Sequence, residues 1–410
     1  MAEPTNTPMP TAPPTPRSTS PALSAATRPT SSTTLSPPKP IIPTSAPLSS
    51  SSLSGVPGGP LGTKPVVLHI GDPVKYNPET YTEFTTLFDV IRPDADERQR
   101  PAFIQALREG RWGDFAAVFR PFWGTGGEMG HWDAELISLL PDSVKVFASA
   151  GTGFDWADTQ LLGERGITYC NGGLAAAEAV SDFAIAMIIS TFRVLPYCIA
   201  SATSSPTAFQ ECHASATAQS HNLRGRTLGL VGLGNIGQQI ALKCSVAFGM
   251  DVAYHDVDRK SPALEARLGA RYCDGLEALA RQSDCAVLCT PAGAGRLINH
   301  ESLAWFKPGA RLVNVARGSL VDEEALAEAL EQGRISAVAL DVHADEPQVH
   351  PRLRAFAGSK AMLTCHNAGG TVETHIGFEE LAMRNIMAVL AGGQAITPVN
   401  LQWLKSKVAQ

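Results

Sequence analysis

A glycine-rich turn between an apolar strand and an apolar helix constrains the fold of this 410-residue chain more than any other feature. The residues G-L-G-N-I-G at 232–237 directly follow the apolar run Thr227–Val231 and precede a stretch with the apolar spacing of a helix. In such a turn Gly232 allows the tight reversal, Gly234 lets the backbone approach a ligand, and Gly237 permits close packing of helix on strand. The turn therefore predicts an α/β domain built on a parallel sheet.

An acidic residue lies where a dinucleotide-binding turn of this kind needs one. Asp256 comes about 20 residues after the turn, at the end of the next predicted strand. Its carboxylate would accept hydrogen bonds from ribose hydroxyls and would repel a 2′-phosphate, although Arg259 and Lys260 follow closely and could offset that repulsion. Asn235 and Ile236 open the helix, whose first N–H groups would face the pyrophosphate. The sequence predicts NAD as the cofactor and leaves NADP as an alternative.

Strand-like and helical stretches alternate on both sides of this turn. The alternation predicts the α/β class, with two Rossmann-like domains that each contain a parallel sheet. The long apolar stretch at 176–192 is a predicted helix that links the domains, and a helix at 379–390 is expected to return to the first of them. The cofactor domain is therefore inserted into the substrate domain. The predicted boundaries are 63–178 and 371–410 for the substrate domain and 179–370 for the NAD-binding domain.

The first 62 residues have a different composition. They are rich in Pro, Ser and Thr, contain no aromatic residue, and carry only four charged side chains. Such a segment buries too little apolar surface to offset its ordering entropy, so we predict a disordered tail. Arg17 and Arg28 in this acid-poor segment leave an organelle transit peptide as an alternative, but repeated prolines would break its amphipathic helix.

Charge and cysteine usage disfavour several classes of partner. Lys and Arg number 33 against 39 Asp and Glu, with no basic block, so nucleic acid is not an expected partner. Apolar runs such as 183–189 are shorter than the roughly 20 residues that cross a bilayer. No secretory signal is evident, and the eight cysteines are scattered without metal-type spacing. We therefore expect a cytoplasmic protein without a membrane partner or a metal.

Three residues far apart in the sequence predict the chemistry. Arg317 in N-V-A-R-G, Glu346 in D-V-H-A-D-E-P and His366 in L-T-C-H-N-A-G-G each follow an apolar strand, at the end where α/β sites are built. A guanidinium can hold a carboxylate with two hydrogen bonds, and an imidazole paired with a carboxylate can exchange a proton. Together with a nicotinamide cofactor, these groups predict hydride reduction of a 2-keto acid. Taken singly, each could be a surface or structural residue.

At this point the motifs resemble a known family. G-L-G-N-I-G, N-V-A-R-G, A-L-D-V-H-A-D-E-P and H-N-A-G-G look like those of the D-isomer-specific 2-hydroxyacid dehydrogenases, over about residues 65–400. Within that family, L-D-V-H-x-x-E-P-Q-V, A-G-T-G-F-D-W and R-x-G-D-F are similar to the D-mandelate dehydrogenases of yeasts and related fungal enzymes.

The resemblance implies a role for each site residue. Arg317 would bind the substrate carboxylate, His366 would act as acid and base, and Glu346 would stabilise the protonated imidazole. Asp341 would bind the nicotinamide carboxamide, and the loop that begins at Ser149 would hold the substrate carboxylate. The further implied contacts are Ala150 and Gly151 for the substrate, and Thr290, Pro291, Ala316 and Gly369 for the cofactor, beside Arg317 and His366. The family also implies a homodimer.

Two departures from the family pattern leave the predicted catalytic groups in place. Cys365 stands before His366 where the family usually has proline, and Val180-Ser181-Asp182 replaces the usual V-A-E. A thiol at position 365 raises the possibility of oxidative sensitivity, against simple packing.

The substrate side chain and one alternative function stay open. Four aromatic residues could line a site for a bulky or branched 2-keto acid: Phe122, Trp123, Trp132 and Trp156. Ordinary core packing is the other interpretation of each. Reduction of glyoxylate or hydroxypyruvate is the alternative within the family. An NAD-sensing binding protein similar to the C-terminal-binding-protein corepressors is the alternative of another class.

Overall fold

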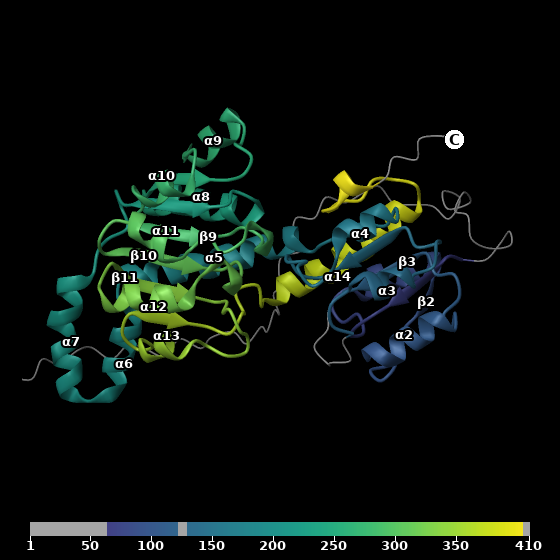
Figure 1. The fold of residues 1–410 in the computed structure, drawn as a ribbon, viewed down its shortest axis with the longest axis horizontal. Coiled ribbons are helices and arrows are strands. Elements are labelled where there is room, and N and C mark those ends of the chain that lie inside the picture. Colours follow the sequence, from purple (N-terminus) through teal and green to yellow (C-terminus); the bar gives the residue numbers. More distant parts are fainter. Residues whose placement is uncertain (1–63, 122–128, 405–410) are drawn as a thin grey trace, which may run out of the picture. The chain divides into compact units, whose positions relative to one another are not determined.

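The computed structural model describes residues 64–121 and 129–404 (Figure 1). These residues all belong to one compact unit of the chain, Pro38–Gln410. The tail predicted over residues 1–62 lies outside the described residues, as do Phe122 and Trp123.

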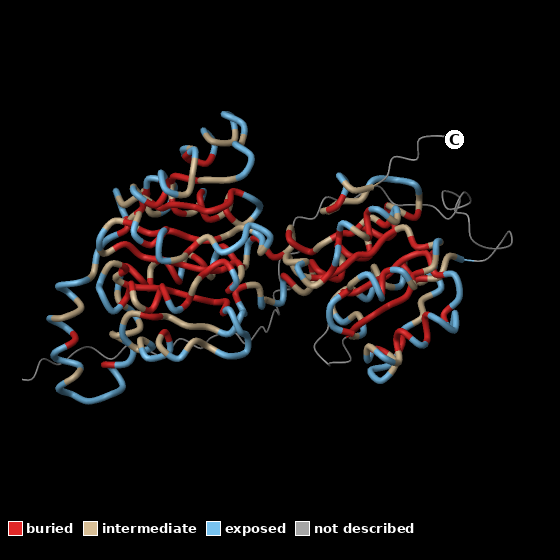
Figure 2. Tube along the Cα trace, in the orientation of Figure 1, coloured by how far each residue is buried: buried red, intermediate tan, exposed pale blue. Residues whose placement is uncertain are grey.

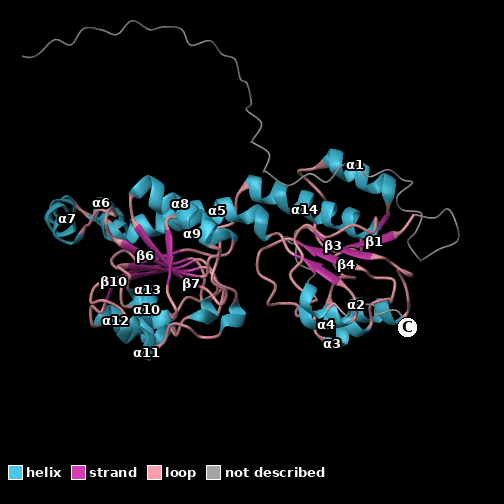
Figure 3. Cartoon of the chain, turned by 90° about the horizontal axis from the view of Figure 1, so that it is seen from above, coloured by secondary structure: helices cyan, strands magenta, loops and turns pink. Residues whose placement is uncertain are grey.

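Two parallel sheets organise the described residues. The first has five strands in the order β2-β1-β3-β4-β5. Its strands are β1 (Val66–His69), β2 (Asp89–Ile91), β3 (Ala117–Arg120), β4 (Val146–Ser149) and β5 (Thr168–Cys170). Its helices are α1 (Pro78–Leu87), α2 (Arg100–Arg108), α3 (Ala134–Ser138) and α4 (Thr159–Glu164). Helices cover both faces, with α1 on one and α2, α3 and α4 on the other (Figure 3).

Full burial explains why the central strands of this sheet are apolar up to their last residues, Arg120 in β3 and Ser149 in β4. Every residue of β3 and of β4 is buried, as expected for a parallel sheet with both faces covered. The core on the α2–α4 side is aromatic, and Trp132 lies in it with no exposed surface, against Phe103 and Phe147. Trp132 is therefore a core residue, so of the two interpretations left open for it the structure supports core packing and not the lining of a substrate site.

The second sheet has seven strands in the order β12-β11-β10-β9-β6-β7-β8. They are β6 (Thr227–Val231), β7 (Asp251–His255), β8 (Ala270–Tyr272), β9 (Cys285–Leu288), β10 (Ala310–Asn314), β11 (Ile335–Leu340) and β12 (Ala361–Leu363). The connecting helices are α8 (Asn235–Phe248), α9 (Pro262–Leu268), α10 (Leu276–Ala280), α11 (His300–Trp305), α12 (Glu323–Glu331) and α13 (Pro351–Ala355), with short 3₁₀ turns η2 (Ala292–Ala294) and η3 (Gly318–Leu320). All these strands are parallel, but the side of the sheet to which successive strands are added changes at β6, which pairs with both β7 and β9. This is the switch point where doubly wound sheets bind ligands.

Helix α5 (Gly173–Phe192) runs between the two sheets in the sequence and packs on elements of the second sheet and on the last helix. By length and composition it is the one described helix that could cross a membrane, but 56% of its most apolar window is buried inside the molecule. Lys243 of α8 reaches across to it and forms ion pairs with Glu178 (2.8 Å) and Asp182 (2.7 Å). Helix α5 therefore has the contacts of a core helix.

The last helix returns to the first sheet. Helix α14 (Val372–Leu390) packs on β3 and β4, opposite the aromatic core, and a 3₁₀ turn η4 (Leu401–Trp403) follows it. Glu379 of α14 accepts hydrogen bonds from the backbone N–H groups of Lys75, Tyr76 and Asn77. The predicted α/β fold with two parallel sheets is confirmed, and so is the return of the C-terminal segment.

Some elements were not predicted. The hairpin of α6 (Leu195–Ser204) and α7 (Pro206–Gln219) follows α5 and is largely exposed (Figure 2). Its sequence is dominated by Ala, Ser and Thr and lacks a regular apolar stripe, which explains the omission. The three-residue strands β2, β5 and β8 were missed as well, because runs so short carry no periodic signal.

Candidate active site

The glycine-rich turn has the geometry that its sequence predicts. Gly232 has a φ of +97°, and a Cβ there would lie 2.8 Å from the carbonyl oxygen of Cys289. A Cβ on Gly237 would lie 2.5 Å from the carbonyl oxygen of Gly232, so helix α8 begins close against the end of β6. A Cβ on Gly234 would meet no atom within 4 Å, so the middle of the turn is open. The turn therefore fits a pyrophosphate at the start of α8, where Asn235 and Ile236 form its first turn.

Asp256 follows β7 and lies beside this turn. Its Oδ2 accepts a hydrogen bond from the N–H of Leu233 (2.8 Å) and pairs with the ammonium of Lys260 (3.1 Å). Burial opposes ionisation, but these two partners together lower the pKa of the Asp256 carboxyl. Arg259 is engaged by Glu265, with its Nε 3.0 Å from Oε1. A carboxylate therefore stands next to the open part of the turn, as NAD binding requires.

The other predicted cofactor residues occupy the same edge of the second sheet. Thr290 and Pro291 come just after β9, separated from it by Cys289, and the Thr290 side chain lies against Gly232. Ala316 follows β10 and donates its N–H to Asn314 Oδ1 (3.0 Å). These positions are consistent with contact to a dinucleotide at the switch point, and the individual contacts stay predictions.

Asp341 organises the loop that carries His366. It is 1% exposed and accepts hydrogen bonds from Thr364 Oγ1 (2.6 Å), Asn367 N–H (3.0 Å) and Ala368 N–H (2.8 Å). Its carbonyl oxygen also accepts from the N–H of His366 (2.7 Å). Both carboxylate oxygens are therefore used in holding this loop against the end of β11.

His366 and Glu346 form a pair at the end of the second sheet. The imidazole Nδ1 lies 2.9 Å from Glu346 Oε2, and Glu346 Oε1 accepts from the N–H of His343 (3.0 Å). His366 has a φ of 54°, an uncommon backbone conformation for a residue with a side chain. Its side chain is 48% exposed, and Nε2 makes no hydrogen bond to any described residue. The pair thus fixes one ring nitrogen and presents the other to solvent.

Arg317 lies beside the loop that follows β4. Its Nε donates to Asp155 Oδ1 (2.9 Å) and its Nη1 to the carbonyl oxygen of Ala316 (2.7 Å). A Cβ on Gly153 would lie 1.2 Å from Nη2, so the guanidinium sits directly against the backbone there. A side chain at position 153 would therefore displace the guanidinium from its present position.

The loop predicted to hold the substrate carboxylate begins in the buried interior of the first sheet. Ser149 is 2% exposed, and its Oγ donates to the carbonyl oxygen of Ala150 (3.0 Å) and accepts from Arg120 Nη1 (3.3 Å). Gly151 accepts a hydrogen bond from the N–H of Gly172 (2.7 Å), which anchors the loop to the start of α5. Gly369 lies near the same helix, because a Cβ on it would be 3.6 Å from Val180 Cγ2.

Two residues near these groups were missed from the sequence. Asp155 pairs with Arg317, and Arg120 stacks on Trp156 with its guanidinium carbon 4.0 Å from the ring centroid. Asp155 stands inside the motif A-G-T-G-F-D-W, and Arg120 is a charge at the end of an apolar strand. Both signals were present, but neither identifies a partner that is distant in the sequence.

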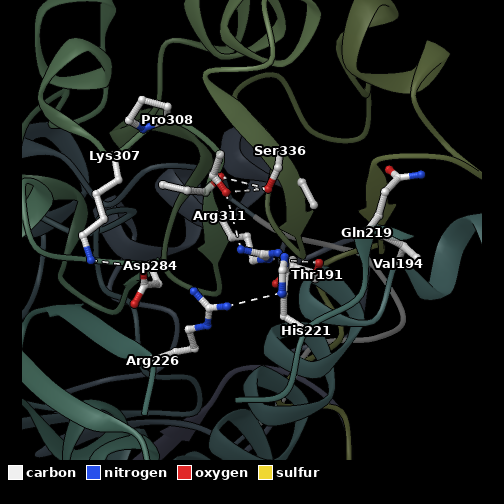
Figure 4. Close-up of a pocket in the computed structure, with 13 residues that line it drawn as sticks. Thr191, Val194, Gln219, His221, Arg226, Asp284, Lys307, Pro308, Arg311 and Ser336 are labelled. Carbon is white, nitrogen blue, oxygen red and sulfur yellow. Dashed lines mark hydrogen bonds and ion pairs between the residues drawn. The ribbon is translucent and has the colours of Figure 1, made fainter. Parts of the chain in front are cut away.

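A polar cavity of about 350 Å³ lies at the opposite, amino-terminal edge of the second sheet (Figure 4). Its charged groups are engaged with one another or with the backbone. Arg311 Nε donates to the carbonyl oxygen of Thr191 (3.2 Å), and Lys307 pairs with Asp284 (3.0 Å). None of the residues predicted for catalysis lines this cavity.

The predicted catalytic residues, in contrast, share one edge. Arg317 follows β10, Glu346 lies in the loop after β11 and His366 follows β12, and these three strands are neighbours. The structure thus gathers a cation, a carboxylate and an imidazole at the sheet edge that also carries the glycine-rich turn. Their roles remain predictions.

Comparison with known proteins decides the family. Residues 185–368 match the model of the D-isomer-specific 2-hydroxyacid dehydrogenase NAD-binding domain. The chain is 31% identical over 301 residues to 4-methyl-2-oxopentanoate reductase A of Aspergillus oryzae, a match that covers 73% of this chain and 88% of that protein. The chain belongs to the D-isomer-specific 2-hydroxyacid dehydrogenase family. It is therefore an oxidoreductase of small 2-keto and 2-hydroxy acids with an NAD-binding domain.

Other members of the family are similarly close. The holo form of D-mandelate dehydrogenase from Rhodotorula graminis has 40% sequence identity and a TM-score of 0.78, with 82% of this chain and 98% of that chain covered. A glyoxylate reductase from Thermococcus onnurineus is 34% identical over 66% of this chain and 80% of that protein. The resemblance predicted from the motifs, including the likeness to D-mandelate dehydrogenase, is confirmed.

Proposed function

We propose that this 2-hydroxyacid dehydrogenase reduces a 2-keto acid with a bulky or branched side chain to the D-2-hydroxy acid, with NADH as the reductant. The observation that carries the proposal is the 2.9 Å contact between His366 and Glu346, at the sheet edge that Arg317 shares. A proton donor and a carboxylate-binding cation at one sheet edge are what reduction of a 2-keto acid requires.

In this mechanism, the glycine-rich turn and Asp256 would hold NADH, which would supply the hydride for the carbonyl carbon. Protonated His366 donates a proton from Nε2 to the carbonyl oxygen, because Nδ1 is held by Glu346. The Glu346 carboxylate stabilises the imidazolium before the transfer and keeps the ring in one orientation. In the direction of oxidation, neutral His366 accepts the hydroxyl proton, so the favoured direction follows pH.

Arg317 binds the substrate carboxylate and polarises the neighbouring carbonyl. Asp155 engages its Nε, which turns the rest of the guanidinium toward the loop that starts at Ser149. Backbone N–H groups of Ala150 and Gly151 would complete the grip on the carboxylate. Asp155 thus positions the guanidinium and keeps its charge balanced until an acid binds.

The size of the substrate side chain is supported by the relatives and by one aromatic residue. Two similar proteins are named for 4-methyl-2-oxopentanoate and for mandelate, both of which carry branched or aromatic side chains. Trp156, stacked on Arg120, lies next to Asp155 in the loop after β4. An aromatic surface there would favour a large apolar group.

Reduction of glyoxylate or hydroxypyruvate is the second candidate, because a glyoxylate reductase is 34% identical to this chain. A spectrophotometric comparison of phenylglyoxylate, 4-methyl-2-oxopentanoate, glyoxylate and hydroxypyruvate would separate the two. We expect kcat/KM to be at least about 10-fold higher for the two bulky acids. Equal or higher values for glyoxylate would favour the second candidate, and no turnover of any acid would favour the corepressor-like binding role.

Cofactor preference, oligomeric state, location and partners are also part of the proposal. Asp256 beside the turn favours NADH over NADPH, although Lys260 reduces the repulsion of a 2′-phosphate. We propose a homodimer in the cytoplasm, without nucleic-acid or membrane partners, which agrees with the family and with the modest negative charge. Light scattering on the purified chain would test the dimer, and a monomer at working concentration would contradict it.

A further inference from the structure

The α6–α7 hairpin has a symmetric turn. Ser205 ends α6 and is also the N-cap of α7, where its Oγ accepts a hydrogen bond from the N–H of Ala208 (3.0 Å). Both helices have a proline in their first turn, which marks where each helix begins. Positions equally far from Ser205 therefore come to the same height on the two helices.

Two cysteines occupy such positions. Cys198 precedes Ser205 by seven residues (205 − 198) and Cys212 follows it by seven (212 − 205). At a rise of about 1.5 Å per residue, each lies roughly 10 Å from the turn along its own helix. Packed antiparallel helices therefore place the two side chains opposite each other.

Both thiols face the same groove of the hairpin. They line a cavity of about 570 Å³, together with residues at helical spacing on each helix. Cys198 is half-buried, and Cys212 is 8% exposed. Burial first, and then the neighbouring Cys212 thiol, raise the pKa of Cys198, so the two groups interact. Neither belongs to a metal-binding group of His, Cys, Asp or Glu in the described part of the chain.

We propose that Cys198 and Cys212 are a modification site, at which a peroxide oxidises the pair to a reversible intrachain disulfide that fastens α6 to α7. The Cys198 thiolate attacks one peroxide oxygen, the O–O bond breaks, and the sulfur becomes a sulfenic acid; the hydroxide that leaves takes up the proton that the thiol lost and becomes water. The Cys212 thiolate then attacks the Cys198 sulfur and forms the S–S bond, and the hydroxide that it displaces takes up the Cys212 proton and becomes a second water. Two thiols thus lose two electrons and two protons, and the peroxide is reduced to two waters.

The cross-link lies away from the chemistry of the second sheet. Helix α5 starts next to Gly151, near the carboxyl ends of the strands, and its last turn meets Arg311 at the amino end of β10. The hairpin continues from that amino-terminal side of the sheet. His221 there lines both the polar cavity at the sheet edge and the cavity of the hairpin. Oxidation should therefore change the stiffness of the hairpin without changing the rate of keto acid reduction.

Other cysteines provide the matched comparison. Cys244 and Cys285 also neighbour each other, but both are fully buried in the core of the second sheet, where burial raises the pKa of each to about 12. Cys365 is exposed, and no hydrogen bond among the described residues joins it to another cysteine. One chain thus contains a fully buried pair, an exposed single thiol, and a pair in which one thiol is half-buried and the other buried.

The experiment oxidises the full-length chain with hydrogen peroxide, blocks the remaining thiols with an alkylating reagent and maps unreduced peptides by mass spectrometry. We expect two of the eight free thiols to disappear together, in one peptide pair that joins Cys198 to Cys212, and to return with dithiothreitol. Cys198→Ser and Cys212→Ser should each abolish that pair, and Cys244→Ser should leave it unchanged. The rate should rise with pH, because the thiolate is the reacting form.

A second measurement keeps the proposal testable if a serine variant fails to fold. Hydrogen exchange of the α6–α7 amides in the oxidised wild-type chain should slow by at least about 10-fold relative to the reduced chain. The proposal is overturned if both thiols stay alkylatable while Cys365 is oxidised, if the cross-link joins two chains, or if exchange in the hairpin is unchanged.

Discussion

His69 in the first sheet and His366 beside the second both lie where a strand ends, but they differ in exposure and in hydrogen-bond partner. His69 is the last residue of β1, has no exposed surface and packs against the ring of Phe119 (4.7 Å between centroids). Its Nε2 lies 2.8 Å from the carbonyl oxygen of Asp72, and burial lowers its pKa to about 4. His366, after β12, is half exposed and is paired with a carboxylate.

The difference shows what a strand end alone does not decide. A fully buried imidazole whose ring nitrogen meets a backbone carbonyl is kept neutral, because charging it would cost desolvation energy. An exposed imidazole held by Glu346 at Nδ1 presents Nε2 to a substrate, as the proposed proton transfer requires. A position at a strand end is thus not enough for proton transfer. The hydrogen-bond partner of the imidazole and its exposure to solvent determine whether it can take part.

Removal of the second histidine should have the largest effect. His366→Ala is expected to lower kcat for keto acid reduction by about 10²–10⁴-fold, because the proton donor is lost. NADH binding, measured by fluorescence titration, should stay near the wild-type value. His300→Ala is the matched control, since His300 forms a comparable pair with Glu328 (3.1 Å) on the surface. Equal losses in the two variants would break the comparison.

The buried histidine should determine acid stability. The folded pKa of His69 is about 4, below the unfolded value near 6.5, so the unfolded chain takes up the proton first as pH falls. Its contribution is therefore complete above pH 6.5 and is lost progressively down to about pH 4, by roughly 3 kcal/mol. His69→Gln should flatten that part of the curve in urea unfolding between pH 7 and pH 4. An unchanged slope would show that His69 does not stay neutral.

Substitution of Arg317, the cation that follows β10 at the same sheet edge, should cost less than loss of the proton donor. Arg317→Lys keeps the charge but loses the two-pronged grip and the contact with Asp155. We therefore expect kcat/KM to fall roughly 30-fold, which corresponds to a loss of about 2 kcal/mol of transition-state stabilisation. Arg352→Lys, at a surface arginine that pairs with Glu331 (2.7 Å), provides the control. A similar kcat/KM for both variants would mean that Arg317 does not bind the acid.

The smallest effect is expected at the cofactor turn. Asp256→Ser removes the carboxylate that meets Leu233 and Lys260 and frees the lysine for a 2′-phosphate. The ratio of kcat/KM for NADH to that for NADPH should fall by about 10-fold, or 1.4 kcal/mol. Steady-state kinetics with both cofactors measures this ratio, and an unchanged value would remove Asp256 from cofactor selection.

The second sheet could be predicted from the sequence better than the first. Its strand β6 was predicted at Thr227–Val231, where it is observed, because an apolar run and a glycine-rich turn mark it clearly. Arg317, Glu346 and His366 stood out since each follows such a run. Asp155 and Arg120 were missed because their importance depends on partners that are distant in the sequence, Arg317 and Trp156.

The burial of Trp132 and the helices of the α6–α7 hairpin could not be predicted from local apolar patterns. Trp132 is aromatic and close to a turn, as a lining residue would be, but the fold places it in the core of the first sheet. The α6–α7 hairpin lacks an apolar stripe and owes its helices to end signals, a proline in each first turn and the Ser205 cap. Sequence periodicity alone does not reveal either.

The most direct test is the configuration of the product. Phenylglyoxylate or 4-methyl-2-oxopentanoate would be incubated with NADH and the purified chain, and the hydroxy acid separated on a chiral column. Oxidation of NADH should match formation of the D-2-hydroxy acid alone, and His366→Ala should slow both by about 10²–10⁴-fold. Formation of the L acid, or consumption of NADH at a near-wild-type rate in the His366→Ala variant, would contradict the proposed site.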